Sequence, residues 1–205
     1  MAGKCVIITG GDFHPVQGVR PGDTLVACDR GYAHALACGL RPDLVIGDFD
    51  SYAGEPDAGI PVLRLPCEKD DTDTMSAVRW ACAAGFEELE LQCALGGRLD
   101  HTLANLQALV FAAQRGLRAS IQSPDTVVRA LHDGTLRIPR REGFSLSVFS
   151  VTDVCRVSIR GAKYALENAV LTNAFPLGVS NEWAAPEAEI RAEGGTVLIV
   201  ESRLR

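Results

Sequence analysis

Residues 42–51 hold the feature that most constrains this chain, a short apolar run that leads into two aspartates. The apolar run, residues 44–46, is typical of a buried strand, and Gly47, Asp48 and Asp50 follow it. Successive side chains of a strand leave on opposite faces, so Asp48 and Asp50 are predicted to lie on the same side. Two carboxylates about 5 Å apart repel each other by roughly 3 kcal/mol at an effective dielectric constant of about 20. A divalent cation, a shared proton or a neighbouring arginine has to balance this repulsion, and we interpret the pair as a metal site.

The first half of the chain alternates between patterns typical of strands and patterns typical of helices. The expected strands are residues 5–8, 24–28, 44–46, 61–65, 88–94 and 119–122, and the expected helices are residues 32–38, 74–84 and 101–115. In the last helix, an apolar stripe is formed by Leu103, Leu106, Leu109 and Ala113. Strands that alternate with helices predict an α/β fold, with a mostly parallel, Rossmann-like sheet flanked by helices.

The pattern changes beyond Pro124, where short alternating runs are separated by turn signals such as Asp133-Gly134. The runs are residues 136–138, 144–148, 157–159 and 196–200, and no helical stripe accompanies them. These features predict a C-terminal antiparallel β-sandwich. We therefore expect two domains, residues 1–123 and residues 124–205.

Composition and charge exclude several classes of protein. The net charge of −6 and the pI of about 5.2 argue against a nucleic acid as the main partner. No apolar run approaches the roughly 18 residues that a membrane helix needs, and the N-terminal apolar run is too short for a signal peptide. The seven cysteines include no C-x-x-C pair, and most stand in apolar surroundings, which favours free thiols in a reducing cytoplasm.

Charged residues recur where predicted strands end and predicted helices begin, and ligands of open α/β sheets bind beyond such strand ends. These residues are Asp29, Asp48, Asp50, Lys69, Asp70, Asp73, Arg98 and Asp100. Mg²⁺ usually takes one or two protein carboxylates and completes its shell with waters and phosphate oxygens. Together with the nearby basic residues, the carboxylates predict a site for a Mg²⁺-bridged polyphosphate. Taken singly, an aspartate or threonine before a helix is often only an N-cap, and Lys69 alone is a solvated charge.

Five segments, in order along the chain, resemble motifs of the thiamine pyrophosphokinase family. Residues 47–51 are similar to its GDxDS signature, 69–73 to KDxTD, 98–105 to RxDHxxxN, 161–166 to GLKYPL and 178–182 to GxSNE. One departure is Cys28-Asp29-Arg30-Gly31, where the family commonly has Ala-Asp-Gly-Gly.

The resemblance implies transfer of the pyrophosphoryl group of ATP to the hydroxyl of thiamine, which gives AMP and thiamine diphosphate. It also implies dependence on Mg²⁺ and a homodimer with thiamine sites at the subunit interface. Residues 1–123 would then bind ATP and Mg²⁺, and residues 124–205 would bind thiamine.

The same resemblance assigns roles to individual residues. The implied Mg²⁺ ligands, which with Arg98 are also the implied catalytic residues, are Asp48, Asp50, Asp73 and Asp100. The implied contacts to ATP and its phosphates are Asp29, Lys69, Asp70, Arg98 and Asn105. Ser180 and Asn181 would contact thiamine. Trp183 is either a platform on which the thiamine ring stacks or a tryptophan of the core or of an interface.

Three other functions remain open at this point. A related pyrophosphokinase would act on another hydroxymethyl heterocycle such as a pterin, and Ser180 and Asn181 favour thiamine over that acceptor. A non-catalytic sensor of thiamine or nucleotide would not need the full set of charges between Asp48 and Asp100. A Mg²⁺-dependent phosphatase would release inorganic phosphate, whereas pyrophosphoryl transfer releases AMP.

Overall fold

The computed structural model describes residues 3–48, 56–66 and 70–204. The chain forms two compact units, Met1–Pro124 and Asp125–Arg205. The boundary lies one residue beyond the one expected from the sequence.

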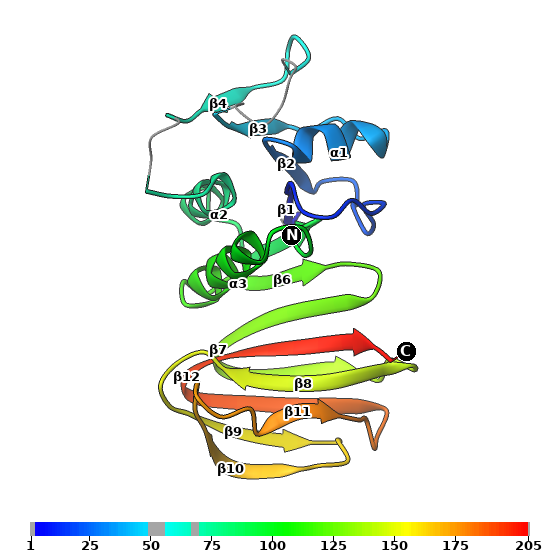
Figure 1. The fold of residues 1–205 in the computed structure, drawn as a ribbon, viewed down its shortest axis with the longest axis vertical. Coiled ribbons are helices and arrows are strands. Elements are labelled where there is room, and N and C mark those ends of the chain that lie inside the picture. Colours follow the sequence, from blue (N-terminus) through cyan, green and yellow to red (C-terminus); the bar gives the residue numbers. More distant parts are fainter. Residues whose placement is uncertain (1–2, 49–55, 67–69, 205) are drawn as a thin grey trace. The chain divides into compact units, whose positions relative to one another are not determined.

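The described residues of the first unit form six strands that pair in parallel, in the order β6-β5-β1-β2-β3-β4 (Figure 1). They are β1 (Cys5–Ile8), β2 (Thr24–Cys28), β3 (Leu44–Gly47), β4 (Val62–Arg64), β5 (Glu88–Gln92) and β6 (Arg118–Gln122). The strand order reverses between β1 and β5, since the chain runs outward from β1 to β4 and then returns to the other side of β1. Ligands of such sheets bind beside the carboxyl ends of strands near this reversal.

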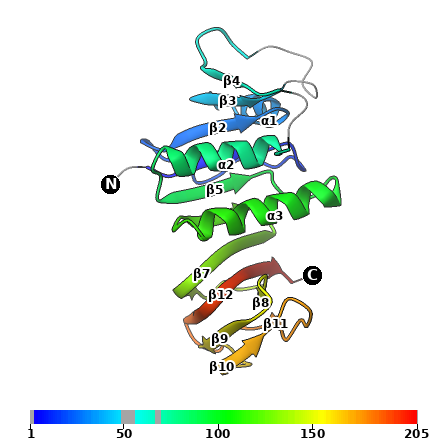
Figure 2. The same cartoon turned by 90° about the vertical axis from the view of Figure 1, so that its left-hand side faces the viewer.

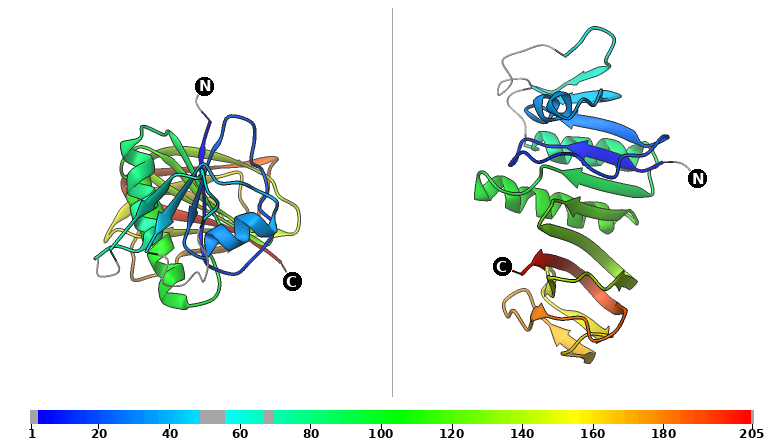
Figure 3. Two further views of the ribbon diagram at one scale, coloured as in Figure 1. Left: turned by 90° about the horizontal axis from the view of Figure 1, so that it is seen from above. Right: turned by 90° about the vertical axis from the view of Figure 1, so that its right-hand side faces the viewer.

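Helices cover both faces of this sheet, as the alternation of patterns predicts (Figure 2; Figure 3). Helix α1 (Gly31–Ala37) lies on one face, and α2 (Asp73–Ala83) and α3 (Leu99–Ala113) lie on the other. None of the helices in the described ranges is long and apolar enough to cross a membrane.

The buried face of α3 coincides only in part with the predicted apolar stripe, of which Leu109 and Ala113 are buried. Leu103 is 53% exposed, whereas Asn105, Ala108 and Ala112 are buried. Small side chains let the backbone of α3 approach its neighbours closely, and the period of the pattern alone does not distinguish this face from the adjacent leucine face.

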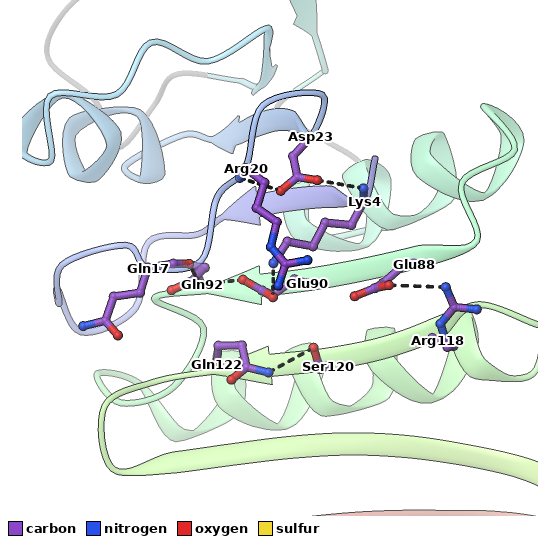
Figure 4. A network of polar contacts seen from close by, with 10 residues as sticks. All are labelled: Lys4, Gln17, Arg20, Asp23, Glu88, Glu90, Gln92, Arg118, Ser120 and Gln122. Carbon is purple, nitrogen blue, oxygen red and sulfur yellow. Dashed lines mark hydrogen bonds and ion pairs between the residues drawn. The ribbon is translucent and has the colours of Figure 1, made fainter. Parts of the chain in front are cut away.

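The face of β5 that carries Glu90 and Gln92 holds a polar network instead of apolar side chains (Figure 4). Leu89 and Leu91 are fully buried, and the alternate residues Glu90 and Gln92 are also buried. The Lys4 ammonium lies 2.5 Å from one carboxylate oxygen of Glu90, and the amide of Gln92 donates to the other oxygen at 2.7 Å. The Lys4 and Glu90 side chains are only 13% and 9% exposed, so each charge depends on the other.

We expect Lys4→Met to lower the free energy of unfolding by about 2 kcal/mol, because the Glu90 carboxylate would be left buried without its cation. The double variant Lys4→Met/Glu90→Gln should recover most of this loss, because the second substitution removes the buried carboxylate charge that Lys4 had neutralised. Urea unfolding of both variants measures this. A double variant as unstable as Lys4→Met would contradict the role given to the Lys4–Glu90 pair.

The second unit consists of antiparallel strands, as predicted. They are β7 (Thr126–Pro139), β8 (Phe144–Ser150), β9 (Cys155–Arg160), β10 (Leu166–Leu171), β11 (Gly178–Asn181) and β12 (Glu187–Arg203). One edge of β12 pairs with β7, and the other pairs with β9 over residues 189–193 and with β8 over residues 197–203. The β12–β7 register shifts between Ala192 and Thr196, so β12 changes its second partner at this irregularity. That the strands form a sandwich stays a prediction.

Candidate active site

The carboxyl ends of β1, β2 and β3 meet at one edge of the sheet, because these strands pair in parallel. Asp29 directly follows β2 and Asp48 directly follows β3. A Cβ atom at Gly47 would collide with the Asp29 carboxylate, so glycine at this position lets Asp29 lie against the end of β3. Asp29 has a φ of 43°, a left-handed conformation that aspartate tolerates better than most residues. The sequence thereby brings acidic side chains of neighbouring strands together.

Asp73, the first residue of α2, completes a group of three carboxylates. One oxygen atom from each of Asp29, Asp48 and Asp73 lies within 4.8 Å of the others, and all three residues are partly buried. At this separation each pair of charges repels by about 3 kcal/mol at an effective dielectric constant of about 20. Mg²⁺ prefers carboxylate oxygens combined with waters and phosphate oxygens. The spacing and chemistry of this three-carboxylate group therefore fit a divalent cation.

A cavity of about 690 Å³ lies at the three-carboxylate group. Its walls come from the ends of strands, from the segment that enters α2 and from the turn that enters α3. The lining residues are Thr9, Gly10, Gly11, Cys28, Asp29, Arg30, Asp48, Asp71, Thr72, Asp73, Thr74, Ala94, Gly96, Gly97, Arg98, His101 and Asn105. Carboxylates for a cation and guanidinium groups for phosphate thus share one cavity.

Arg98 and Asp100 form a bidentate ion pair at the start of α3. Arg98 Nε donates to Asp100 Oδ1 at 3.1 Å, and Arg98 Nη2 donates to Asp100 Oδ2 at 2.5 Å. These hydrogen bonds raise the pKa of Arg98 and lower the pKa of Asp100. Among the described residues, Asp100 is not part of the three-carboxylate group, and the metal role that the resemblance implied for it stays a prediction. Its carboxylate orients Arg98, which lines the cavity.

The polar residues of the segment before α2 have different partners and surroundings. Thr72 is the N-cap, and its hydroxyl accepts a hydrogen bond from the Met75 N–H at 3.1 Å. Asp71 pairs with Arg79 at 2.6 Å, and Asp70 is exposed and is not among the residues that line the cavity. Asp50 and Lys69, both predicted site residues, lie outside the described residues.

Asn105 connects α3 to the end of β5. It is 6% exposed, and its Nδ2 donates to the Ala94 carbonyl at 2.8 Å. Asn105 lines the cavity, so the residue predicted to contact phosphate also holds the wall of the cavity in place.

In the second unit, Asn181 is the last residue of β11, which also carries Ser180. Asn181 is buried, and its Oδ1 accepts from the N–H groups of Tyr164 at 2.9 Å and Glu182 at 3.0 Å. Its Nδ2 donates to the Tyr164 carbonyl at 2.8 Å. Ser180 is exposed and has a φ of 57°, a backbone conformation that costs energy in a residue with a Cβ. Ser180 is thus exposed on β11, and Asn181 ties the end of β11 to the segment at Tyr164.

Trp183 belongs to the apolar core of the second unit. It is 8% exposed, packs in a cluster that includes Ile138 and Ile190, and its Nε1 donates to the Ile138 carbonyl at 3.2 Å. Of the two interpretations left open by the sequence, the structure favours the core tryptophan over the stacking platform.

Two parts of the cavity wall were not predicted from the sequence. The first is Thr9-Gly10-Gly11 after β1, where the Thr9 hydroxyl donates to the Cys93 carbonyl at 2.6 Å. The signal for it was present, because these residues follow a predicted strand as Asp29 and Asp48 do. The second is Arg30, which the sequence showed only as a departure from a motif.

Comparisons with known proteins agree with this architecture. Residues 19–121 match a family model described as the catalytic domain of thiamin pyrophosphokinase, and residues 134–197 match its vitamin B1 binding domain. The chain is 26% identical over 185 residues to a thiamine pyrophosphokinase of Bacillus subtilis, which covers 86% of each protein.

Solved structures show the same fold. The crystal structure of a thiamine pyrophosphokinase from Bacillus subtilis superposes with a TM-score of 0.88 at 22% identity, covering 98% of this chain and 99% of that one. The crystal structure of a thiamin pyrophosphokinase from Geobacillus thermodenitrificans gives a TM-score of 0.83 at 27% identity, covering 97% of this chain and 96% of that one. Since the two family models together span most of its length, the chain belongs to the thiamine pyrophosphokinase family.

Proposed function

We propose that this chain, an enzyme that transfers a pyrophosphoryl group, uses Mg²⁺·ATP and thiamine and forms AMP and thiamine diphosphate. Membership of the family supports the reaction. The observation that carries the Mg²⁺ dependence is the three-carboxylate group at the edge of the sheet.

Asp29, Asp48 and Asp73 would hold the cation, and Asp50 is predicted to join them. When bound, Mg²⁺ would neutralise charge on the phosphate oxygens of ATP. Transfer of a phosphoryl-type group needs little covalent help from a protein, so positioning and charge stabilisation supply most of the catalysis.

Arg98 would stabilise negative charge on the transferred group. A guanidinium has five N–H donors, and the pair with Asp100 uses two of them, so donors remain for phosphate oxygens. Asp100 fixes the direction of the guanidinium and thereby acts through Arg98. Lys69 and Asp70 are further candidates for the phosphate site, and Asn105 supports its wall.

Thiamine would bind to the second unit, with the exposed Ser180 as a contact. A homodimer with thiamine sites at the subunit interface is part of the same proposal. A cytoplasmic location is also proposed; it is supported by the free thiols of Cys5, Cys28, Cys38, Cys82, Cys93 and Cys155 among the described residues.

Product analysis tests the reaction. The protein is incubated with Mg²⁺, ATP and thiamine, and AMP, ADP, inorganic phosphate and thiamine diphosphate are quantified. We expect equal amounts of AMP and thiamine diphosphate, and no product in excess EDTA. ADP as the nucleotide product would contradict pyrophosphoryl transfer, and free phosphate without thiamine diphosphate would indicate a phosphatase. Preference for a hydroxymethyl pterin over thiamine would identify the related pyrophosphokinase instead.

A further inference from the structure

Arg30 occupies the turn between β2 and α1, beside the three-carboxylate group. Its backbone has φ −56° and ψ −23°, an ordinary right-handed conformation, so this position does not require glycine. At the next residue, a Cβ on Gly31 would collide with the Ile8 carbonyl. The backbone at Gly31 therefore packs closely against the carboxyl end of β1. This packing fixes the position of the neighbouring Arg30 backbone, from which the Arg30 side chain extends.

The aliphatic part of the Arg30 side chain lies over Gly10. A Cβ built on Gly10 would be 3.2 Å from Arg30 Cβ and 3.9 Å from both Cγ and Cδ. Arg30 therefore runs along the segment after β1 while remaining exposed, and it lines the same cavity as Asp29, Asp48 and Asp73. A guanidinium on this stem lies within reach of a ligand in the cavity.

The two arginines of the cavity differ in their partners. Arg98 is bound by Asp100, whereas none of the ion pairs between described residues of the first unit involves Arg30. The charge of Arg30 nevertheless acts on a buried group of the first unit, the His34 imidazole. Burial lowers the pKa of His34, and the positive charge of Arg30 acts in the same direction. A guanidinium that stays charged and has donors to spare, at the edge of an acidic cavity, is suited to phosphate.

We infer that Arg30 is a phosphate-binding residue of this enzyme, which donates hydrogen bonds to the phosphate chain of the nucleotide in the cavity. The inference rests on the proposed function, because ATP is the ligand. It concerns a position at which this chain departs from the family motif, because the family commonly has glycine where this chain has Arg30. Arg30 would add a second guanidinium to the cavity that Arg98 and the three-carboxylate group also line.

Arg30→Gln tests the inference, with Arg20→Gln as a control that removes the same charge from an exposed arginine that does not line the cavity. Calorimetry in the absence of thiamine measures the Kd of Mg²⁺·ATP and of adenosine. Loss of a charge-assisted hydrogen bond predicts that Arg30→Gln binds Mg²⁺·ATP about tenfold to a hundredfold more weakly. We expect unchanged affinity for adenosine, an unchanged KM for thiamine and partial recovery in Arg30→Lys. Arg20→Gln should bind Mg²⁺·ATP as the wild type does.

Two results would overturn the inference, provided that circular dichroism shows folded variants. One is an affinity of Arg30→Gln for Mg²⁺·ATP equal to that of Arg20→Gln. The other is an equal loss of affinity for Mg²⁺·ATP and adenosine, which would place Arg30 at the nucleoside.

Should Arg30→Gln itself fail to fold, the comparison of Arg30→Lys with Arg30→Gly decides, since only lysine retains a charge. A wild-type protein that forms thiamine diphosphate while Arg30→Gln keeps its ATP affinity refutes the Arg30 role alone. A wild-type protein without product refutes the proposed function alone.

Discussion

Asp48→Asn is expected to lower the rate of thiamine diphosphate formation by about a thousandfold, the loss typical of removing a group that fixes transition-state charge. An amide oxygen is neutral, so the three-carboxylate group would lose a third of the charge that attracts the cation. The KM for Mg²⁺ should rise, and added Mg²⁺ should restore part of the rate. Rates measured across a range of Mg²⁺ concentrations at saturating ATP and thiamine show this.

Asp57→Asn provides the matched control, because it makes the same change on an exposed residue that does not line the cavity. This variant should retain the wild-type rate. In EDTA, Asp48→Asn should melt no lower than the wild type, because removing one of three mutually repelling charges relieves repulsion. A rate within tenfold of the wild type at limiting Mg²⁺ would refute the metal role of Asp48.

Trp183→Ala is expected to lower the free energy of unfolding by about 3–5 kcal/mol, the usual cost of emptying a buried tryptophan site. The side chain is 8% exposed within the core of the second unit, and its Nε1 donates to the Ile138 carbonyl. The variant loses apolar burial and leaves that carbonyl without this donor. Urea unfolding followed by circular dichroism measures the loss.

Trp183→Phe separates packing from substrate binding. Phenylalanine keeps an aromatic face and loses volume and the N–H donor, so stability should fall by about 1–2 kcal/mol while the KM for thiamine stays near the wild-type value. A stacking role predicts the opposite result. Unchanged stability with a tenfold higher KM for thiamine would return Trp183 to the substrate site.

The first unit could be predicted closely because its strands are short and bounded by turn residues, and because β1, β2 and β3 are mostly apolar. The predicted strands 5–8 and 24–28 coincide with β1 and β2, and the predicted helices lie within two residues of α1, α2 and α3. The second unit was harder to predict. β12 extends over 17 residues, but only 196–200 was predicted, because its first half alternates charged residues with small Ala188 and Ala192. β10 and β11 were not predicted. Both are irregular strands with register shifts, and each contains a non-glycine residue with a positive φ, Asn168 in β10 and Ser180 in β11.

The site residues divide in a similar way. The rule that ligands bind at carboxyl ends of parallel strands depends on chain order alone, and it selected Asp29 and Asp48. Asp73 was selected as a residue at a helix N-terminus. The resemblance implied that Asp29 contacts ATP, whereas the structure groups it with Asp48 and Asp73. The pairing of Asp100 with Arg98 depends on side-chain geometry, which spacing in the sequence does not reveal. The burial of Trp183 against Ile138 joins residues 45 positions apart, so it became visible only in the folded chain.

The position of the cation tests the central claim most directly. Crystals of the full chain soaked with Mn²⁺ and ATP, without thiamine, would give an anomalous difference map that locates the metal. We predict a peak within bonding distance of carboxylate oxygens of Asp29, Asp48 and Asp73, with phosphate oxygens completing its shell. No peak at these three residues, in crystals that hold Mn²⁺ and nucleotide elsewhere, would contradict the account.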